Sequence, residues 1–282
     1  MFVTNTCSGD GFGSQFQFLL SLILISLTRG DTFLYTPLNR IHHNYDNNPV
    51  FIQKLEGFMN IYSRFQLIRS VSVYRRSRVR IMENAEVKKM FDRDIDSFTS
   101  PENLAFVREM FWANKTRLKR PYDDPFFRVA VHIRRLNRYD DLYHYGQSAY
   151  DERFSDKHYY LRIMNHIRET YADRNDPRPL RFHIYAQSAV LDRDHGGNSD
   201  TDEDLVAFFG EEDVIYHIDT DMCDTFLDMV RADALVTSAS SFSYTAALLS
   251  EGEIFYRPFW HRPLATWRVM ETATETAAET VA

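Results

Sequence analysis

The sequence of 282 residues has little of what marks several protein classes. Two cysteines, Cys7 and Cys223, are too few for a disulfide framework or a cysteine-rich zinc site, although one bridge between them is allowed. Only 10 glycines and 9 prolines exclude collagen-like and linker-rich chains. The net charge of −7 shows no basic excess, so we expect no nucleic-acid partner.

Long hydrophobic runs are also lacking. The longest apolar stretch, residues 16–27, is too short to cross a bilayer as a helix. A signal peptide has basic residues ahead of its apolar region, whereas residues 1–15 contain Asp10 and no lysine or arginine. We therefore interpret the stretch as a core helix and expect a soluble, cytoplasmic protein without a membrane anchor.

Apolar and aromatic residues are plentiful, at 44% and 15% of the chain, which is enough for sizeable cores. The length favours two domains. Prolines and charged residues cluster at 118–126, so we predict domains at 1–124 and 125–270. The low-complexity residues 271–282 form a tail.

Strand-like and helix-like segments alternate along the chain. The second half has predicted strands at 127–133, 181–187, 213–218, 233–238 and 253–257, with helical patterns between most of them. The first half has predicted strands at 1–6 and 31–36, helices at 14–28 and 50–62, an extended segment at 71–82 and a helix opened by Ser100 and Pro101. This alternation predicts the α/β class, with parallel sheets that bind ligands beyond the carboxyl ends of their strands.

A glycine-rich turn, GDGFGSQ at 9–15, lies between the first predicted strand and helix. Glycines let a ligand approach the backbone, and the N-terminus of a helix favours anionic groups. A tight turn without a ligand explains the pattern equally well. The residues that we expect to line a cleft from this loop are Gly11, Phe12, Gly13 and Gln15.

Two arginines follow the strand predicted at 127–133. Strand alternation sends His132 and Arg134 to one face of the sheet and Arg135 to the other. Arginine binds phosphate through two parallel hydrogen bonds, so an anion would stabilise charges in this position. Ion pairs with the acidic residues at 140–141 are the alternative explanation.

A run of hydroxyl residues, TSASSFS at 237–243, connects a predicted strand to a predicted helix. Ser240 and Ser241 are placed to cap the helix, and Ser243 follows in its first turn. Ordinary capping needs only one serine, so the others suggest an anion cradle built from hydroxyls and backbone N–H groups.

The arginines and the serines belong to one predicted sheet, at the same edge. Together they would neutralise a diphosphate without a metal, which fits the departure of a diphosphate from a sugar. Such a transfer also needs a base for the acceptor hydroxyl. Candidates are Asp10, Asp140 and Asp141, and we favour Asp10 because its loop is expected on the acceptor side of a cleft.

Three motifs resemble those of the α-1,2-, α-1,6- and protein O-fucosyltransferases and follow one another in the same order over residues 1–257. They are GDGFGSQFQ at 9–17, HIRR at 132–135 and an aspartate, Asp224, ahead of a Ser-Ser-Phe-Ser helix start. The resemblance implies a GT-B fold, with two Rossmann-like domains facing each other across a cleft. It also implies inverting transfer from a nucleotide-sugar donor to a glycan hydroxyl, with no obligatory cofactor or metal.

By motif position, the resemblance places the family's phosphate-binding arginine on Arg134 and its base-recognising residues on His132 and Asp224. The full set that it assigns to the donor is His132, Arg134, Arg135, Asp224, Ser240, Ser241, Phe242 and Ser243. GDP-fucose is the default donor. Residues 136–138 intervene before Asp140, and Ser14 replaces a family asparagine, so UDP-xylose is an alternative donor.

Two further interpretations stay open. Asp219 and Asp221 form an Asp-x-Asp pattern that would hold Mn²⁺ or Mg²⁺ in a metal-dependent glycosyltransferase, although the pattern recurs often enough to be accidental. A non-catalytic nucleotide- or glycan-binding module would stack sugars on Trp112, Trp260 or Trp267. The sequence does not determine the oligomeric state.

Overall fold

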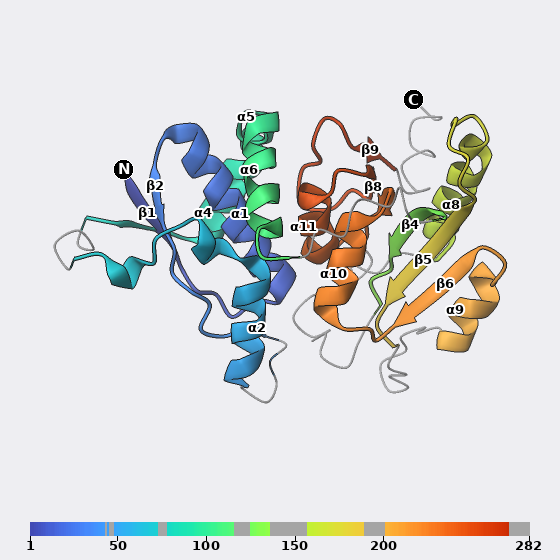
Figure 1. Cartoon of the computed structure of the whole chain (residues 1–282), viewed down its shortest axis with the longest axis horizontal. Coiled ribbons are helices and arrows are strands. Elements are labelled where there is room, and N and C mark those ends of the chain that lie inside the picture. The colour runs from blue at the N-terminus through green and yellow to red at the C-terminus, as the bar shows by residue number, and fades with distance from the viewer. Residues whose placement is uncertain are drawn as a thin grey trace, which may run out of the picture. The chain divides into compact units, whose positions relative to one another are not determined.

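The computed structural model describes residues 1–42, 44, 48–72, 78–115, 125–135, 157–188 and 201–270. The chain divides into two compact units, Met1–Leu118 and Lys119–Ala282 (Figure 1). Each unit has its own parallel sheet with helices packed around it, which confirms the predicted α/β class.

The first unit has a parallel sheet in the order β2-β1-β3. Its strands are β1 (Phe2–Asn5), β2 (Thr32–Leu34) and β3 (Arg80–Met82). Its helices are α1 (Phe12–Arg29), α2 (Pro49–Met59), α4 (Asn84–Arg93), α5 (Ile95–Phe98) and α6 (Pro101–Trp112), with short 3-10 turns η1 (Ile61–Ser63) and η2 (Ile68–Ser70).

The apolar stretch forms most of α1 and is a core helix, as predicted. Phe16, Leu20 and Leu24 are completely buried, and the helix contacts α4, α5 and α6. Gly30 ends it in the left-handed conformation at φ 66°, which glycine adopts without strain. Among the described residues, no helix combines the length and the apolar character needed to cross a membrane.

Other elements of the first unit differ from the prediction. Among the described residues of the extended segment expected at 71–82, the strand is β3, which pairs with β1; residues 73–77 lie outside the described residues. Helix α4 was not predicted, since its polar sequence buries only Val87 and Phe91. The start of α6 is as predicted, with the Ser100 hydroxyl accepting a hydrogen bond from the Asn103 N–H at 3.3 Å.

The second unit contains all five strands predicted for it. They are β4 (Phe127–His132), β5 (Leu180–Ala186), β6 (Val214–Ile218), β7 (Ala234–Val236) and β8 (Glu253–Tyr256), and a two-residue strand, β9 (Arg268–Val269), was too short to predict. The helices are α8 (Lys157–Tyr171), α9 (Asp202–Phe209), α10 (Met222–Arg231) and α11 (Ser241–Leu249).

The order of this sheet is β6-β5-β4-β7-β8-β9, and all neighbouring strands are parallel. Within the second unit, the chain therefore enters the middle of the sheet at β4 and runs outward to β6. It then crosses back to β7 and runs outward again to β9. This is the doubly wound order of the Rossmann fold. Its direction reverses between β4 and β7, and ligands bind at such a switch point, beyond the carboxyl ends of the strands.

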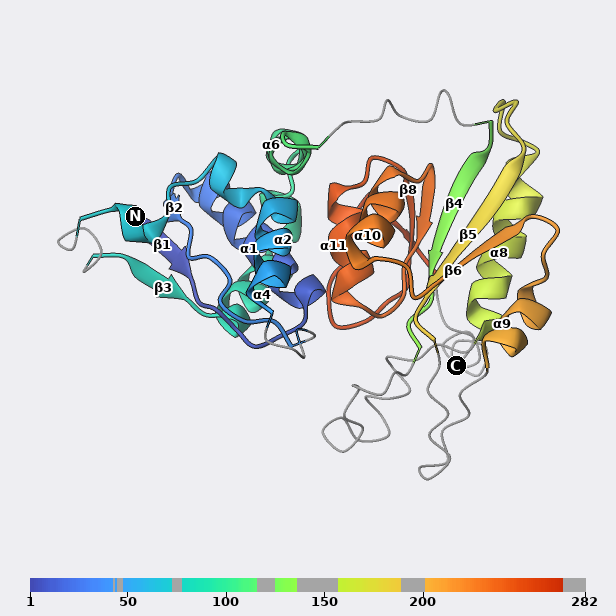
Figure 2. The same ribbon diagram turned by 60° about the horizontal axis from the view of Figure 1, so that its bottom comes forward.

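Helices cover both faces of the sheet, with α8 and α9 on one side and α10 and α11 on the other (Figure 2). On the α8 side, Val129 and Val131 of β4 pack into the core with Tyr160. The alternate residues of β4 face the other way, so Arg128 contacts Asp228 of α10 and His132 contacts Phe242 of α11.

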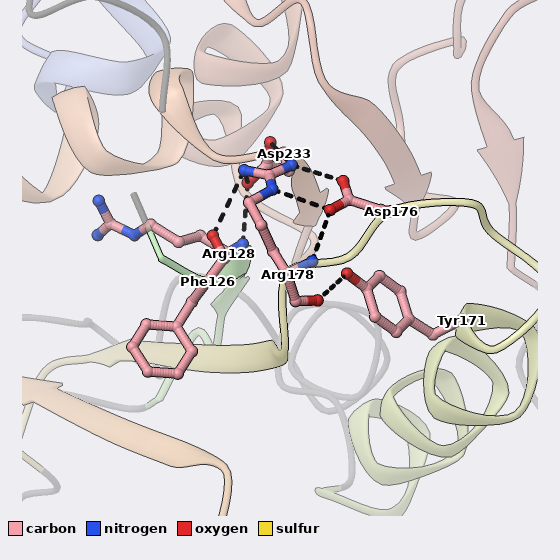
Figure 3. Close-up of polar contacts among 6 residues, drawn as sticks. All are labelled: Phe126, Arg128, Tyr171, Asp176, Arg178 and Asp233. Carbon is pink, nitrogen blue, oxygen red and sulfur yellow. Dashed lines mark hydrogen bonds and ion pairs between the residues drawn. The ribbon is translucent and has the colours of Figure 1, made fainter. Parts of the chain in front are cut away.

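The amino edge of the sheet is closed by an ion network centred on Arg178 (Figure 3). Its guanidinium lies 2.7 Å from an Asp176 carboxylate oxygen and 3.0 Å from one of Asp233. Asp233 also accepts the backbone N–H of Arg128, and the Tyr171 hydroxyl donates to the Arg178 carbonyl. These contacts join the starts of β4, β5 and β7.

Candidate functional site

The candidate site lies in the second unit, where β4 and β7 end side by side. Val131 and Val236 are paired in register, so His132 and Thr237 follow at the same level of the sheet. The chain continues from β4 to Arg134 and from β7 through the serine run into α11. The fold thus brings together the arginine and serine motifs that are more than a hundred residues apart in sequence.

A hydrogen bond joins the two strand ends directly. The Ser238 hydroxyl lies 2.8 Å from Nδ1 of His132. Desolvation, aided by the charge of Arg134, lowers the pKa of His132 to about 3. The imidazole is therefore neutral at physiological pH and holds one end of the serine turn.

The serine turn is stabilised from inside. The Ser243 hydroxyl accepts the N–H of Ser238 at 3.2 Å and lies within 3.4 Å of the Ser238 and Ser240 carbonyl oxygens. Ser243 is completely buried, so the structure places its side chain in the turn and not on the outer surface of the site. Ser240 caps α11 by accepting the Phe242 N–H at 3.3 Å.

The N-terminus of α11 is suited to an anion. The first N–H groups of a helix have no partners within it and carry partial positive charge. No acidic residue lies in the first turn of α11, and Ser241 and Phe242 are partly exposed there. The positive end of this helix is thus accessible from the carboxyl edge.

Strand β4 ends at His132, so strand alternation does not extend to the two arginines. Arg135 forms an ion pair with Asp202, the first residue of α9, and donates to the Gln187 carbonyl at 3.3 Å. This partner was not among those considered from the sequence, which were Asp140 and Asp141. The catalytic-base candidates at 140–141 lie outside the described residues.

Helix α10 begins at the same edge. Asp224 is exposed in its first turn, where the resemblance expects a base-recognising residue. Phe226 packs on Phe242 with ring centroids 5.3 Å apart, and Phe242 lies 5.6 Å from the His132 ring. This row of rings connects α10, α11 and β4.

Both aspartates of the Asp-x-Asp pattern have structural partners. Asp219 has a left-handed backbone at φ 51°, and its carboxylate accepts the N–H and hydroxyl of Ser188. Asp221 caps α10 by accepting the N–H of Cys223 at 2.9 Å. In the part of the chain that the structure describes, no three His, Cys, Asp or Glu side chains are arranged as metal ligands.

The glycine-rich turn belongs to the first unit, beyond the carboxyl end of β1. Asp10 is exposed, and its carboxylate accepts the Ser14 hydroxyl at 3.1 Å. The Asp10 carbonyl accepts the Gln15 side-chain amide at 2.8 Å and the His42 N–H at 3.2 Å. These bonds fix the backbone of the turn and leave its carboxylate at the surface.

The expectation that this whole loop lines a cleft is wrong in part. Phe12, Gly13 and Gln15 are buried, because α1 begins at Phe12, two residues earlier than predicted, and the Gln15 amide donates to the Asp10 and Arg40 carbonyls. Gly11 caps α1 with an ordinary φ of −64°. At Gly9, the glycine is explained by close packing against Arg40, because a Cβ there would lie 3.2 Å from the Arg40 guanidinium.

Sequence reasoning missed two residues that follow β8. Arg257 is 5% exposed, and its backbone N–H donates to the Thr237 hydroxyl at 3.0 Å. His261 is equally buried, with Nε2 3.5 Å from the Ser241 hydroxyl. The available signal was an arginine at the end of a predicted strand, but nothing in the sequence showed that His261 returns to α11.

Solved glycosyltransferase structures are similar to this chain at low sequence identity. The fucosyltransferase NodZ from Bradyrhizobium is 10% identical, over 92% of this chain and 96% of its own, with a TM-score of 0.39. A variant of FUT1 from Arabidopsis thaliana with GDP is 14% identical, over 93% and 72%, with a TM-score of 0.42. The E. coli heptosyltransferase WaaC with ADP is 10% identical, over 99% and 98%, with a TM-score of 0.41. No protein-family model and no curated protein matches the sequence.

Proposed function

We propose that the protein is an inverting glycosyltransferase whose second unit binds the diphosphate of a nucleotide-sugar at the switch point between β4 and β7. The observation that best supports this proposal is the His132–Ser238 hydrogen bond of 2.8 Å. It ties the segment bearing Arg134 to the serine turn that opens α11. A fixed cation and a helix N-terminus therefore follow two strands that end side by side.

The proposed chemistry is electrostatic. When the bond between the anomeric carbon and the phosphate oxygen breaks, negative charge accumulates on the diphosphate. The guanidinium of Arg134 and the first N–H groups of α11 stabilise that charge. Because the helix fixes its N–H groups before the reaction, they need little reorganisation to stabilise the leaving diphosphate.

The other donor residues have supporting roles in this proposal. Neutral His132 and buried Ser243 hold the serine turn, while Arg135, paired with Asp202, anchors the segment after β4. Ser240 and Ser241 contact the phosphate oxygens. A carboxylate at Asp224 suits the adjacent N–H donors of guanine, which favours GDP-fucose over UDP-xylose as donor.

Asp10 is the proposed base. The acceptor hydroxyl of a glycan attacks the anomeric carbon from the side opposite the leaving diphosphate, which inverts its configuration. The proton passes to a carboxylate near the attacking oxygen. Asp10 qualifies because its carboxylate is at the surface of a turn whose backbone is fixed by hydrogen bonds.

The test begins with thermal shifts over GDP, UDP, GDP-fucose and UDP-xylose. We expect one nucleotide to stabilise the protein. Arg134→Ala should fold normally but lose transfer about a hundredfold or more, as when another preorganised oxyanion donor is removed. Arg93→Ala, at an exposed ion pair of the first unit, is the control. Near-normal turnover in Arg134→Ala overturns the proposed mechanism.

Asp10→Asn separates binding from catalysis in the same assay. It should bind the donor like the wild type and lose transfer by about a hundredfold or more. Full transfer would show that Asp10 is not the base. Donor binding by the wild type, with neither transfer nor donor hydrolysis across a panel of saccharides, would support the non-catalytic binding module instead.

A further inference from the structure

An aromatic segment that follows β8 lies against the N-terminus of α11. This segment, residues 257–262, has the sequence RPFWHR. Its His261 reaches the hydroxyl of Ser241, the first residue of α11, at 3.5 Å. The segment thus borders the proposed phosphate site, although the mechanism above gives it no role.

Two buried tyrosines hold the segment in place. The Tyr256 hydroxyl donates to the His261 carbonyl, and the Tyr244 hydroxyl donates to the Arg262 carbonyl at 2.8 Å. Both tyrosines are completely buried. Because the backbone is fixed at consecutive residues, the side chains of the segment are presented with little freedom to lose on binding.

Trp260 is the exposed ring of this segment. Its side chain is 39% exposed, whereas Trp267 is 8% exposed. The indole packs beside Phe259 and His261, with ring centroids 5.1 Å and 6.3 Å away. A rigid, partly exposed indole offers a flat apolar face, and binding sites for small molecules are lined by such aromatic surfaces.

The position of this ring relates to the direction of the donor. One side of the α11 N-terminus is bordered by the His132 ring, which contacts Phe242 of α11. Phe242 also contacts Phe226 of α10, the helix whose first turn contains Asp224. His261 contacts Ser241 from the segment after β8. If the base occupies the Asp224 side, the diphosphate extends across the helix N-terminus and the sugar lies toward Trp260.

We propose that Trp260 stacks against the donor's sugar ring and selects for it; this rests on the proposed function. A pyranose has an apolar face of C–H groups that covers an indole well, while its hydroxyls remain free for polar contacts. His261 positions Ser241 at the phosphate end. Trp260 therefore distinguishes a nucleotide-sugar from the nucleoside diphosphate that remains after transfer.

Trp260→Ala tests this by titration calorimetry with GDP and GDP-fucose, or with UDP and UDP-xylose if the uridine pair is bound. The Kd of the nucleoside diphosphate should stay within about twofold, while that of the nucleotide-sugar should rise about tenfold. Trp260→Phe should recover part of this loss because a flat ring remains. Tyr62→Ala, at an exposed aromatic of the first unit, is the matched control and should change neither value.

Acrylamide quenching gives a second readout in the Trp112→Phe variant, where Trp260 is the more exposed of the two remaining indoles. Saturating nucleotide-sugar should protect the fluorescence, and the nucleoside diphosphate should not. Equal weakening of both ligands by Trp260→Ala, or no weakening of either, overturns the inference and leaves the proposed function standing. Failure of the wild type to bind any of the four ligands overturns both.

Discussion

Arg178 shows how one side chain stabilises the edge of the sheet that the proposed site does not use. Its guanidinium lies between Asp176 and Asp233, with all three side chains less than one quarter exposed. Its hydrogen bonds hold the pKa of Asp176 below the ordinary value. Because the network joins three strand starts, its contribution belongs to stability and not to the reaction.

Arg178→Ala should lower the free energy of unfolding by about 1–3 kcal/mol, because two partly buried carboxylates lose their charged donor. Chemical denaturation measures this. Arg93→Ala, whose ion pair with Asp94 is largely exposed, should change stability by no more than about 1 kcal/mol. Equal effects of the two variants would contradict the role given to the network. Donor affinity in Arg178→Ala should remain that of the wild type.

At the scale of elements, the caps of α10 and α11 decide what the polar residues at the carboxyl edge do. Of the Asp-x-Asp pattern, Asp221 uses its carboxylate to cap α10, and Asp219 accepts hydrogen bonds from Ser188. Ser240 caps α11 while α11 keeps a first turn free of acidic residues. The two helices therefore begin at one edge of the sheet with different charge: the first turn of α10 is acidic and that of α11 is neutral.

Asp221→Ala should destabilise the protein by about 1 kcal/mol through loss of the cap, whereas Asp221→Asn should change stability by only a few tenths. Thermal or chemical unfolding measures the pair. Transfer activity should survive in Asp221→Asn, and EDTA should affect it no more than the wild type. Loss of activity in a stable Asp221→Asn variant would favour the metal-dependent alternative.

At the scale of the whole molecule, stability should depend on pH through histidines that the fold keeps neutral. Desolvation lowers the pKa of both His132 and His217, and the value for His132 is about 3. At a pH below the ordinary histidine pKa near 6.5, these histidines bind protons in the unfolded chain but not in the folded chain. Stability therefore falls as pH falls from 6.5, and the contribution of His132 continues toward pH 3.

Denaturant unfolding between pH 7 and 4.5 measures this effect above the range where most carboxylates titrate. Each histidine that becomes protonated on unfolding contributes a slope of up to about 1.4 kcal/mol per pH unit. His132→Asn should reduce the slope, whatever its effect on stability at pH 7. An unchanged slope would show that His132 is not held neutral by the fold.

The periodicity of the sequence was sufficient for most elements of the second unit. Its five strands bury apolar residues, and their lengths are set by those runs, so they were predictable. Strand β9 was not, because two residues carry no pattern. In the first unit, α4 was missed because only Val87 and Phe91 are buried on it.

The local sequence of the candidate site determined its chemistry. It placed Arg134 after a strand and serines at a helix start. Tertiary structure alone decided that β4 and β7 are neighbours, that Arg135 forms an ion pair with Asp202 and that His261 contacts Ser241. Those contacts join residues distant in sequence, and their energies depend on strand order and packing that no local pattern encodes.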